Sequence, residues 1–258
     1  KESYVYDELN RLIRENSQNQ KKTLTYEYDL GGNLVKVCEY PYTTGTLPAE
    51  AAATETGSFG QVWRDKLMKW NGVAMQYDSI GNMTQKGNTT FTWAQGRKLE
   101  SVNNGKKIRY YYDHAGNRVK KTVDNVTTEY CMAGDLLVTE KIGEQRIWYY
   151  YDSAANPIAI RVSGKEYFYV RNLQNDVIAL IDDVGESVVE YKYNSWGKIL
   201  SITGSKAGTI GKANPFRYRG YYYDEETGMY YLKNRYYDPE IRRFISADSY
   251  ISGFNSTM

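Results

Sequence analysis

The sequence predicts an all-β protein made from a long strip of antiparallel β-hairpins. Three observations support this prediction: a Tyr-Asp turn motif recurs along the chain, residues alternate in character before each copy, and tyrosine dominates the aromatic residues. The chain has 27 Tyr among 258 residues, against 6 Phe and 5 Trp. Aromatic side chains suit strands, because they bury large areas and keep a polar tip. The mean hydropathy of −0.67 is low for a compact globule, so we expect a sheet with one or both faces in water.

The repeat consists of a Tyr-Asp pair, a short turn and a second strand. Five copies begin at Tyr6-Asp7, Tyr28-Asp29, Tyr77-Asp78, Tyr112-Asp113 and Tyr151-Asp152. Looser copies begin at Trp93, Tyr130, Tyr169 and Tyr193. From Tyr77 onward the copies recur with a period of about 20 residues, which indicates stacked supersecondary units.

The turn in each copy reads Asp-x-x-Gly-Asn in its fullest form. Aspartate suits the first position of a type I turn, where its carboxylate accepts a backbone N–H two residues on. Glycine suits the fourth position, where φ is often positive, and the asparagine beside it also tolerates a left-handed backbone. Alternating segments such as 107–112 and 118–123 flank the turn, so each copy predicts one hairpin. Stacked hairpins form a strip that must curve or coil to bury one face.

Two segments interrupt the pattern. Residues 43–60 are predicted to be an irregular insertion, in which the run Pro-Ala-Glu-Ala-Ala-Ala could form a helical turn. Residues 204–213 are predicted to be a flexible loop. They do not match a phosphate-binding loop, because Lys206 stands where a glycine is required and Ala213 where a serine or threonine is required. We therefore expect a hairpin strip over 1–203, a loop over 204–213 and a separate domain over 214–258.

Composition argues against several classes of function. A net charge of +2 gives no electrostatic reason to bind nucleic acid or an anionic membrane. No apolar run is long enough for a membrane-spanning helix. His114 is the only histidine and Cys38 and Cys131 the only cysteines, which is too few for a conventional zinc site or most histidine-based triads. One disulfide is possible. We expect no metal and no cofactor.

The acidic turns and the first residues of the sequence carry two further expectations. The acidic turns Asp182-Asp183 and Asp224-Glu225-Glu226 are each followed by a glycine within three residues. They are expected to be solvated rather than to form the paired acids of a glycosidase. Lys1 opens in the middle of the pattern without a charged and apolar leader, which indicates a piece of a longer protein.

The most unusual stretch is 214–248, which is dense in tyrosine and arginine. Its motif residues are Asn214, Pro215, Arg217, Gly220, Asp224, Gly228, Tyr236, Asp238, Pro239, Arg243 and Phe244. The stretch resembles the Rhs repeat-associated core, in its Gram-positive wall-associated form. The Tyr-Asp units resemble the YD repeats of Rhs proteins, bacterial wall-associated proteins, insecticidal toxin-complex C components and teneurins. The resemblance covers nearly the whole chain.

The resemblance implies a strip of hairpins that spirals into a shell around a toxic C-terminal polypeptide, with the core closing one end. In many members the core also cuts the chain just after itself, using two aspartates and an arginine. Asp248 matches the first aspartate and Arg235 the arginine. The second aspartate lies in a later motif that this chain, ending at Met258, lacks, so we expect the chain not to be an enzyme by itself. Ser249 and Arg242 depart from the family's usual Pro and Gly.

Several alternatives stay open. Arg235 and Asp248 could form a structural ion pair rather than half of a cleavage site. The aromatic rows could stack on sugars, which would make the chain a carbohydrate- or surface-binding module. Because 258 residues give only about a dozen hairpins at this period, we expect an open or partial shell capped by the core. The expected partners are its own C-terminal cargo, other shell segments or a cell-surface glycan, and the expected location is secreted or at the cell surface.

Overall fold

The computed structural model describes residues 2–62 and 64–248, and these residues are almost entirely β-structure. Strands β1–β20 form a 20-stranded antiparallel sheet, and β21–β24 form a second sheet of four strands. Within the described residues, β1 and β20 each pair on one side only, so the large sheet stays open. The predicted all-β hairpin strip is therefore confirmed.

The chain divides into two compact units, Lys1–Gln76 with Gln85–Gly87, and Tyr77–Thr84 with Asn88–Met258. The strands of the first unit pair antiparallel in chain order from β1 to β7. These strands are β1 (Glu2–Tyr6), β2 (Leu12–Ser17), β3 (Lys22–Tyr28), β4 (Leu34–Pro41), β5 (Ala53–Phe59), β6 (Leu67–Trp70) and β7 (Val73–Tyr77), followed by β8 (Met83–Lys86), whose residues are shared between the units.

In the second unit, β9–β20 also pair antiparallel in chain order. They are β9 (Thr89–Ala94), β10 (Lys98–Asn103), β11 (Lys107–Tyr112), β12 (Arg118–Val123), β13 (Val126–Ala133), β14 (Leu136–Ile142), β15 (Gln145–Tyr151), β16 (Pro157–Val162), β17 (Lys165–Arg171), β18 (Val177–Ile181), β19 (Ser187–Tyr193) and β20 (Ile199–Thr203). The second sheet follows as β21 (Tyr222–Asp224), β22 (Met229–Leu232), β23 (Arg235–Asp238) and β24 (Arg243–Phe244).

The tyrosine of three Tyr-Asp pairs, and of the looser copy at Tyr193, ties two neighbouring strands together where their ladder ends. The pairing with the following strand shifts register just before this residue. The pairing with the preceding strand has already ended there, as at Arg14↔Thr25 and Ser101↔Arg109. Beyond that point, the tyrosine hydroxyl donates to a carbonyl of the preceding strand. The bonds are Tyr28 to Leu12 at 2.8 Å, Tyr112 to Leu99 at 2.9 Å, Tyr151 to Leu137 at 2.7 Å and Tyr193 to Val177 at 2.8 Å.

The aspartate of each pair organises the turn that follows. In the copy at Asp29, Oδ1 accepts the backbone N–H of Asn33 at 2.8 Å, and Oδ2 accepts its side-chain amide at 2.9 Å. The N–H of Gly32 donates to the Asp29 carbonyl at 3.0 Å, with Gly32 at φ 84°. The copies at Asp78 and Asp113 repeat these bonds. Asn33 does not adopt the left-handed backbone we considered, because the turn uses its side chain instead.

Two expectations about the interruptions were wrong in part. Residues 43–60 are not irregular throughout, since Ala53–Phe59 form β5 between β4 and β6. Residues 48–53 form no helical turn, because the N–H of Ala52 already donates to the Glu39 carbonyl at 2.7 Å as the chain enters that strand. The predicted loop 204–213 ends in a single helical turn, α1 (Ile210–Ala213).

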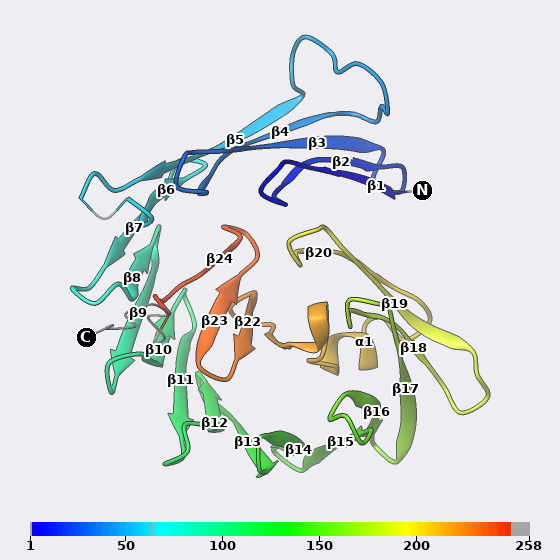
Figure 1. The fold of residues 1–258 in the computed structure, drawn as a ribbon. Coiled ribbons are helices and arrows are strands. Elements are labelled where there is room, and N and C mark those ends of the chain that lie inside the picture. Colours follow the sequence, from blue (N-terminus) through cyan, green and yellow to red (C-terminus); the bar gives the residue numbers. More distant parts are fainter. Residues whose placement is uncertain (1, 63, 249–258) are drawn as a thin grey trace, which may run out of the picture. The chain divides into compact units, whose positions relative to one another are not determined.

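The core of the second unit lies between the inner face of the repeat sheet and the C-terminal segment. Figure 1 shows β9–β20 as an arc with α1 and β22–β24 on its inner side. One tyrosine from every second strand points into this core: Tyr130, Tyr149, Tyr167 and Tyr191. These side chains pack with aliphatic residues such as Ile160 and Leu180, both 0% exposed.

Helices play a small part in the described residues. Besides α1, there is one 3₁₀ turn, η1 (Tyr218–Gly220). No helix over 2–62 and 64–248 is long and apolar enough to cross a membrane. The two cysteines are free thiols, Cys38 buried and Cys131 exposed, so the disulfide that we considered possible is not formed.

The turn at Asp152 offers a test of the repeat's backbone requirement. Ala155 takes the place of the turn glycine at φ 63°, a conformation that strains any residue with a Cβ. Ala155→Gly should therefore raise the free energy of unfolding by about 0.5–1 kcal/mol, measured by urea denaturation. Ala154→Gly in the same turn, where φ is not positive, is the matched control and should lower it. Equal effects of the two changes would contradict this account.

Candidate functional site

The C-terminal segment enters the inner face of the repeat sheet through Phe216. Its ring centroid lies 5.0 Å from that of Tyr149 and 6.2 Å from that of Tyr222, both edge-on. Tyr151 and Tyr169 lie 6.3 and 6.4 Å away in the same geometry. Edge-on aromatic pairs stabilise by about 0.5–1.5 kcal/mol beyond the area they bury. Tyrosines of two successive repeats thus form a socket for Phe216 of the C-terminal segment.

Asn214 and Arg217 fix the backbone on either side of this socket. Asn214 is fully buried, and its Oδ1 accepts the Tyr169 hydroxyl at 2.9 Å while its Nδ2 donates to the Phe216 carbonyl at 2.7 Å. Arg217 is 1% exposed, donates from Nε to the Asn214 carbonyl at 3.2 Å and pairs with Glu225 at 2.8 Å. Both predicted motif residues therefore serve to seat the segment.

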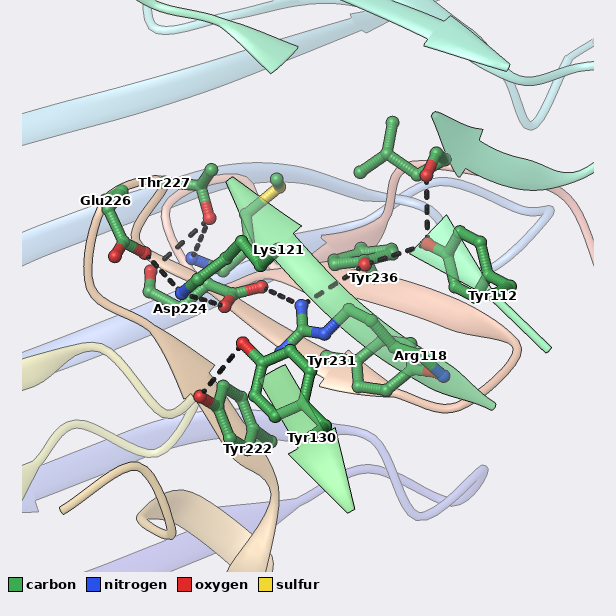
Figure 2. Close-up of polar contacts among 12 residues, drawn as sticks. Tyr112, Arg118, Lys121, Tyr130, Tyr222, Asp224, Glu226, Thr227, Tyr231 and Tyr236 are labelled. Carbon is green, nitrogen blue, oxygen red and sulfur yellow. Dashed lines mark hydrogen bonds and ion pairs between the residues drawn. The ribbon is translucent and has the colours of Figure 1, made fainter. Parts of the chain in front are cut away.

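A buried ion cluster joins the C-terminal segment, through Asp224, to strand β12. Asp224, which is 0% exposed, accepts from Arg118 Nη1 through Oδ2 and from Lys121 Nζ through Oδ1, the latter at 3.0 Å. Lys121 also pairs with Glu226 at 2.8 Å. Figure 2 shows the two cations on β12 pointing at the carboxylate from the core segment. The expectation that Asp224 lies in a solvated turn was therefore wrong, because two cations on β12 meet its carboxylate in the interior.

Arg118 is enclosed by tyrosine rings as well as paired. Its guanidinium carbon lies 4.4 Å from the centroid of Tyr231, 4.7 Å from Tyr222, 4.9 Å from Tyr130 and 5.2 Å from Tyr110. The faces of these rings attract a cation, and the attraction grows when water is excluded. The rings come from both the repeats and the core, so Arg118 is held only when both are in place.

Burial and charge act in opposite directions on Asp224. Burial alone would raise the pKa of the carboxyl, but the positive charges of Arg118 and Lys121 outweigh burial and hold the pKa below its usual value. The attraction to Asp224 likewise raises the pKa of Lys121 in spite of burial, which acts against its charge. All three groups therefore stay charged at neutral pH.

Glu140, on the neighbouring strand β14, behaves differently. It is 3% exposed and accepts the Tyr149 hydroxyl at 2.8 Å. Burial raises the pKa of Glu140 above its usual value, although the Tyr149 hydrogen bond and the charge of Lys121 act against this rise. The folded protein therefore favours the protonated carboxyl more than the unfolded chain does.

The other predicted core residues shape the second sheet. The Tyr236 hydroxyl lies 3.0 Å from that of Tyr112 and 3.3 Å from Arg118 Nη1. Asp238 is 1% exposed and accepts the Glu240 N–H at 2.9 Å. The remaining motif residues are Pro215 and Pro239, both buried, Gly220 and Gly228 at φ 69° and 70°, and Arg243 and Phe244, which form β24.

The structure brings Arg235 and Asp248 together. Arg235 Nη1 lies 2.9 Å from Asp248 Oδ2, and the guanidinium carbon lies 3.9 Å from the ring centroid of Phe244. The two side chains are 32% and 51% exposed. This geometry fits either a structural ion pair or one half of a cleavage site. Ser249, the departure noted beside Asp248, lies outside the described residues.

A cavity of about 280 Å³ lies beside Arg118, and most of its lining is apolar. Its single lining carboxylate, Asp135, pairs with Lys233 rather than with a second acid. Across 2–62 and 64–248, no three His, Cys, Asp or Glu side chains gather as metal ligands would.

Sequence reasoning did not identify Arg118, Lys121 or Glu140 as site residues. Their strands read as solvated alternation, because charged residues are usually exposed. The signal that could have revealed them is local. The hairpin that carries Arg118 and Lys121 has a full Asp-x-x-Gly-Asn turn, and the register shift after Tyr111 decides which residues face inward.

Comparison with known proteins identifies the family to which the chain belongs. A model of the teneurin YD-shell matches residues 1–257. The chain belongs to the teneurin YD-shell family. The predicted Rhs/YD-repeat resemblance is thereby confirmed, and the chain is a segment of YD-shell scaffold.

One reported relative of this YD-shell segment is named a nuclease and another a toxin. The chain is 34% identical over 251 residues to the "tRNA3(Ser)-specific nuclease WapA" of Bacillus spizizenii, covering 94% of this chain and 10% of that protein. It is 26% identical to the "Double-stranded DNA deaminase toxin A" of Burkholderia cenocepacia, covering 95% of this chain and 20% of that protein. The YD-shell segment thus spans a small part of these relatives.

A solved structure supports the fold. The crystal structure of TcdB2-TccC3 without its hypervariable C-terminal region superposes with a TM-score of 0.75 at 18% identity, over 96% of this chain and 14% of that chain. At this level of identity the likeness concerns the YD-shell fold alone.

The buried ion cluster gives a mutational prediction. Asp224→Asn should lower the free energy of unfolding by about 3–5 kcal/mol, because it leaves Arg118 and Lys121 buried without their shared counter-charge. Glu226→Gln is the matched control. Glu226 is 23% exposed, so its loss should cost about 1 kcal/mol or less. Urea denaturation measures both, and equal losses would show that the burial of Asp224 is not what makes it important.

The raised pKa of Glu140 predicts a pH dependence. An acid whose pKa is higher in the folded state favours folding most below its unfolded pKa, and this contribution is lost as pH rises through the folded value. Glu140→Gln keeps an acceptor for Tyr149 and removes the titration. The variant should therefore gain stability over the parent as pH rises from about 4 to 7. Glu129→Gln, an exposed neighbour, is the control. A difference that does not change with pH would contradict this assignment.

Proposed function

We propose that this YD-shell segment is part of a scaffold that encloses a C-terminal toxin polypeptide and delivers it. The scaffold role needs no chemistry from the segment itself, so we propose that residues 1–258 act without catalysing a reaction on another molecule. A secreted or cell-surface location is part of this proposal, since a delivered toxin must leave the cell that makes it. The partner is the protein's own cargo.

The observation that carries this proposal is how the inner face of the sheet holds polypeptide. The hydroxyl of Tyr191 donates to the Gly211 carbonyl at 2.8 Å, and that of Tyr169 donates to the Asn214 side chain at 2.9 Å. Tyrosines offer apolar area and one adaptable donor each, so they accept backbone of almost any sequence. A sheet that already wraps its own C-terminal segment in this way suits the enclosure of further chain.

The names of the relatives support the cargo part of the proposal. One is a tRNA-specific nuclease and another a DNA deaminase toxin, and this chain spans 10% and 20% of their lengths. We propose that a toxic domain likewise belongs to the longer protein that contains this segment.

The carbohydrate-binding alternative has less support. On the outer face, the Arg161 guanidinium carbon lies 5.6 Å from the Trp148 ring and 5.8 Å from Tyr150. An arginine that covers both rings competes with a stacked sugar.

A second candidate activity, self-cleavage, is favoured by the 2.9 Å contact between Arg235 and Asp248. We propose that this pair, with a further aspartate elsewhere in the full-length protein, hydrolyses one peptide bond of the protein's own chain. One water is consumed: its oxygen bonds to the scissile carbonyl carbon, the C–N bond breaks, and the leaving nitrogen takes a proton. One aspartate would activate the water while the other supplies the proton.

Protease protection tests the scaffold proposal. In the full-length protein, trypsin should cut the toxic domain at least about tenfold more slowly than it cuts the same domain expressed alone, because access then depends on rare opening of the shell. Asp224→Asn should reduce this protection, since it weakens the seat of the core. Lys198→Ala is the control, because it removes only an exposed ion pair to Glu240. Equal cleavage of the enclosed and isolated domains would overturn the proposal.

A further inference from the structure

Two consecutive residues of the repeat sheet hold the two residues that precede the Arg235–Asp248 pair. Arg97 Nη1 donates to the carbonyl of Ala247, immediately before Asp248. Lys98 Nζ donates to Asn234 Oδ1 at 3.4 Å, immediately before Arg235. Arg97 is the last residue of the turn between β9 and β10, and Lys98 is the first residue of β10. One hairpin turn therefore contacts both arms of the candidate site.

The repeat sheet fixes the same segment at a second point. The backbone N–H of Met83 donates to the Ile245 carbonyl at 2.8 Å, and the N–H of Ile245 donates to the Tyr236 carbonyl at 3.0 Å. Ile245 is 0% exposed. The Met83 carbonyl accepts the Trp93 indole N–H at 2.7 Å, which links this anchor to β9. The chain is thus held three residues before Asp248, between the repeats and the core.

The Ala247 contact matters because burial does not fix the candidate pair. Asp248 is 51% exposed and Arg235 is 32% exposed, so burial alone does not set the positions of their side chains. The Ala247 carbonyl belongs to the peptide unit that continues into Asp248, and its hydrogen bond sets the direction in which the Asp248 side chain leaves the backbone. A displacement of about 1 Å at a reacting group can cost a hundredfold in rate.

We infer that Arg97 is a positioning residue for self-cleavage, and that the β9–β10 hairpin makes cleavage depend on a folded repeat sheet. This inference rests on the self-cleavage proposed above. Arg97 and Ala247 lie 150 positions apart, so the contact forms only when the repeats have closed on the core. An unfolded or half-folded strip would leave Asp248 without its anchor. The arrangement therefore delays the release of cargo until the scaffold around the core is complete.

The test uses the full-length protein and follows the cleavage product over time on denaturing gels. Arg97→Ala should slow cleavage by about tenfold to a hundredfold, since it loosens the Asp248 segment without removing the pair. Arg97→Lys keeps a charged donor and should recover part of the rate. Arg109→Ala, an exposed arginine on β11, is the matched control and should cleave at the parent rate. Equal rates for Arg97→Ala and the parent would overturn the inference.

Two further measurements distinguish a failure of the positioning role of Arg97 from a failure of the self-cleavage proposal. If the parent protein is not cleaved, or if Asp248→Asn is cleaved as fast as the parent, the self-cleavage proposal fails. Hydrogen exchange of the peptide over 244–248 then still tests the anchor. Arg97→Ala should raise its exchange rate by about tenfold while the free energy of global unfolding stays near that of the parent. Unchanged exchange there would reject the positioning role, whatever the cleavage result.

Discussion

The fully buried carboxylate of Asp224 is the constraint on which the second unit depends. A charge in this position is tolerated only if counter-charges arrive with it, and both counter-charges, Arg118 and Lys121, come from one repeat strand more than 100 residues earlier. The cluster need not add much net stability, because desolvating four charges offsets most of their attraction. Its effect is on specificity. The core cannot settle against any other strand without leaving an unpaired charge in the interior, so the register of the core against the sheet is fixed.

The repeat motif is explained by the hydrogen bonds that its tyrosine and aspartate side chains make, and not by turn propensity alone. Tyrosine donates to a carbonyl of the preceding strand beyond the end of their ladder, and aspartate accepts the N–H groups of the turn. The degenerate copy at Asn172 shows that the pattern of donors and acceptors, not the residue identity, is what persists. There the asparagine stands first and Asp176 stands last, so the motif is reversed. Asn172 Oδ1 still accepts the backbone N–H groups of Gln174 and Asp176, each at 2.9 Å, and its Nδ2 donates to Asp176 Oδ2 at 2.7 Å.

The sequence was sufficient for the hairpin strip, because a period near 20 residues and a fixed turn are local signals. It was misleading over 43–60, where the repeat motif is missing but β5 still completes a ladder supplied by β4 and β6. The site was harder to predict. Charged residues on an alternating strand read as solvated, and Lys121 becomes buried only because Asp224 reaches it from 103 positions away. The contact between Arg97 and Ala247 spans 150 positions, and no local pattern encodes it.

The inner face of the repeats also shows how a uniform scaffold acquires a specific interior. Glu15, Lys121 and Glu140 stand at equivalent places, each opposite a residue that lies two before a buried tyrosine: Tyr26, Tyr130 and Tyr149. Where the residue is glutamate, the tyrosine hydroxyl donates to it, at 2.9 Å for Glu15 and 2.8 Å for Glu140. Where it is lysine, the charge meets Asp224 from the core instead. Because the backbone is alike in these hairpins, a change of one side chain changes the charge on the inner face. In these three repeats the hairpin supplies the geometry, and this single inward position sets the charge on the inner face of the sheet.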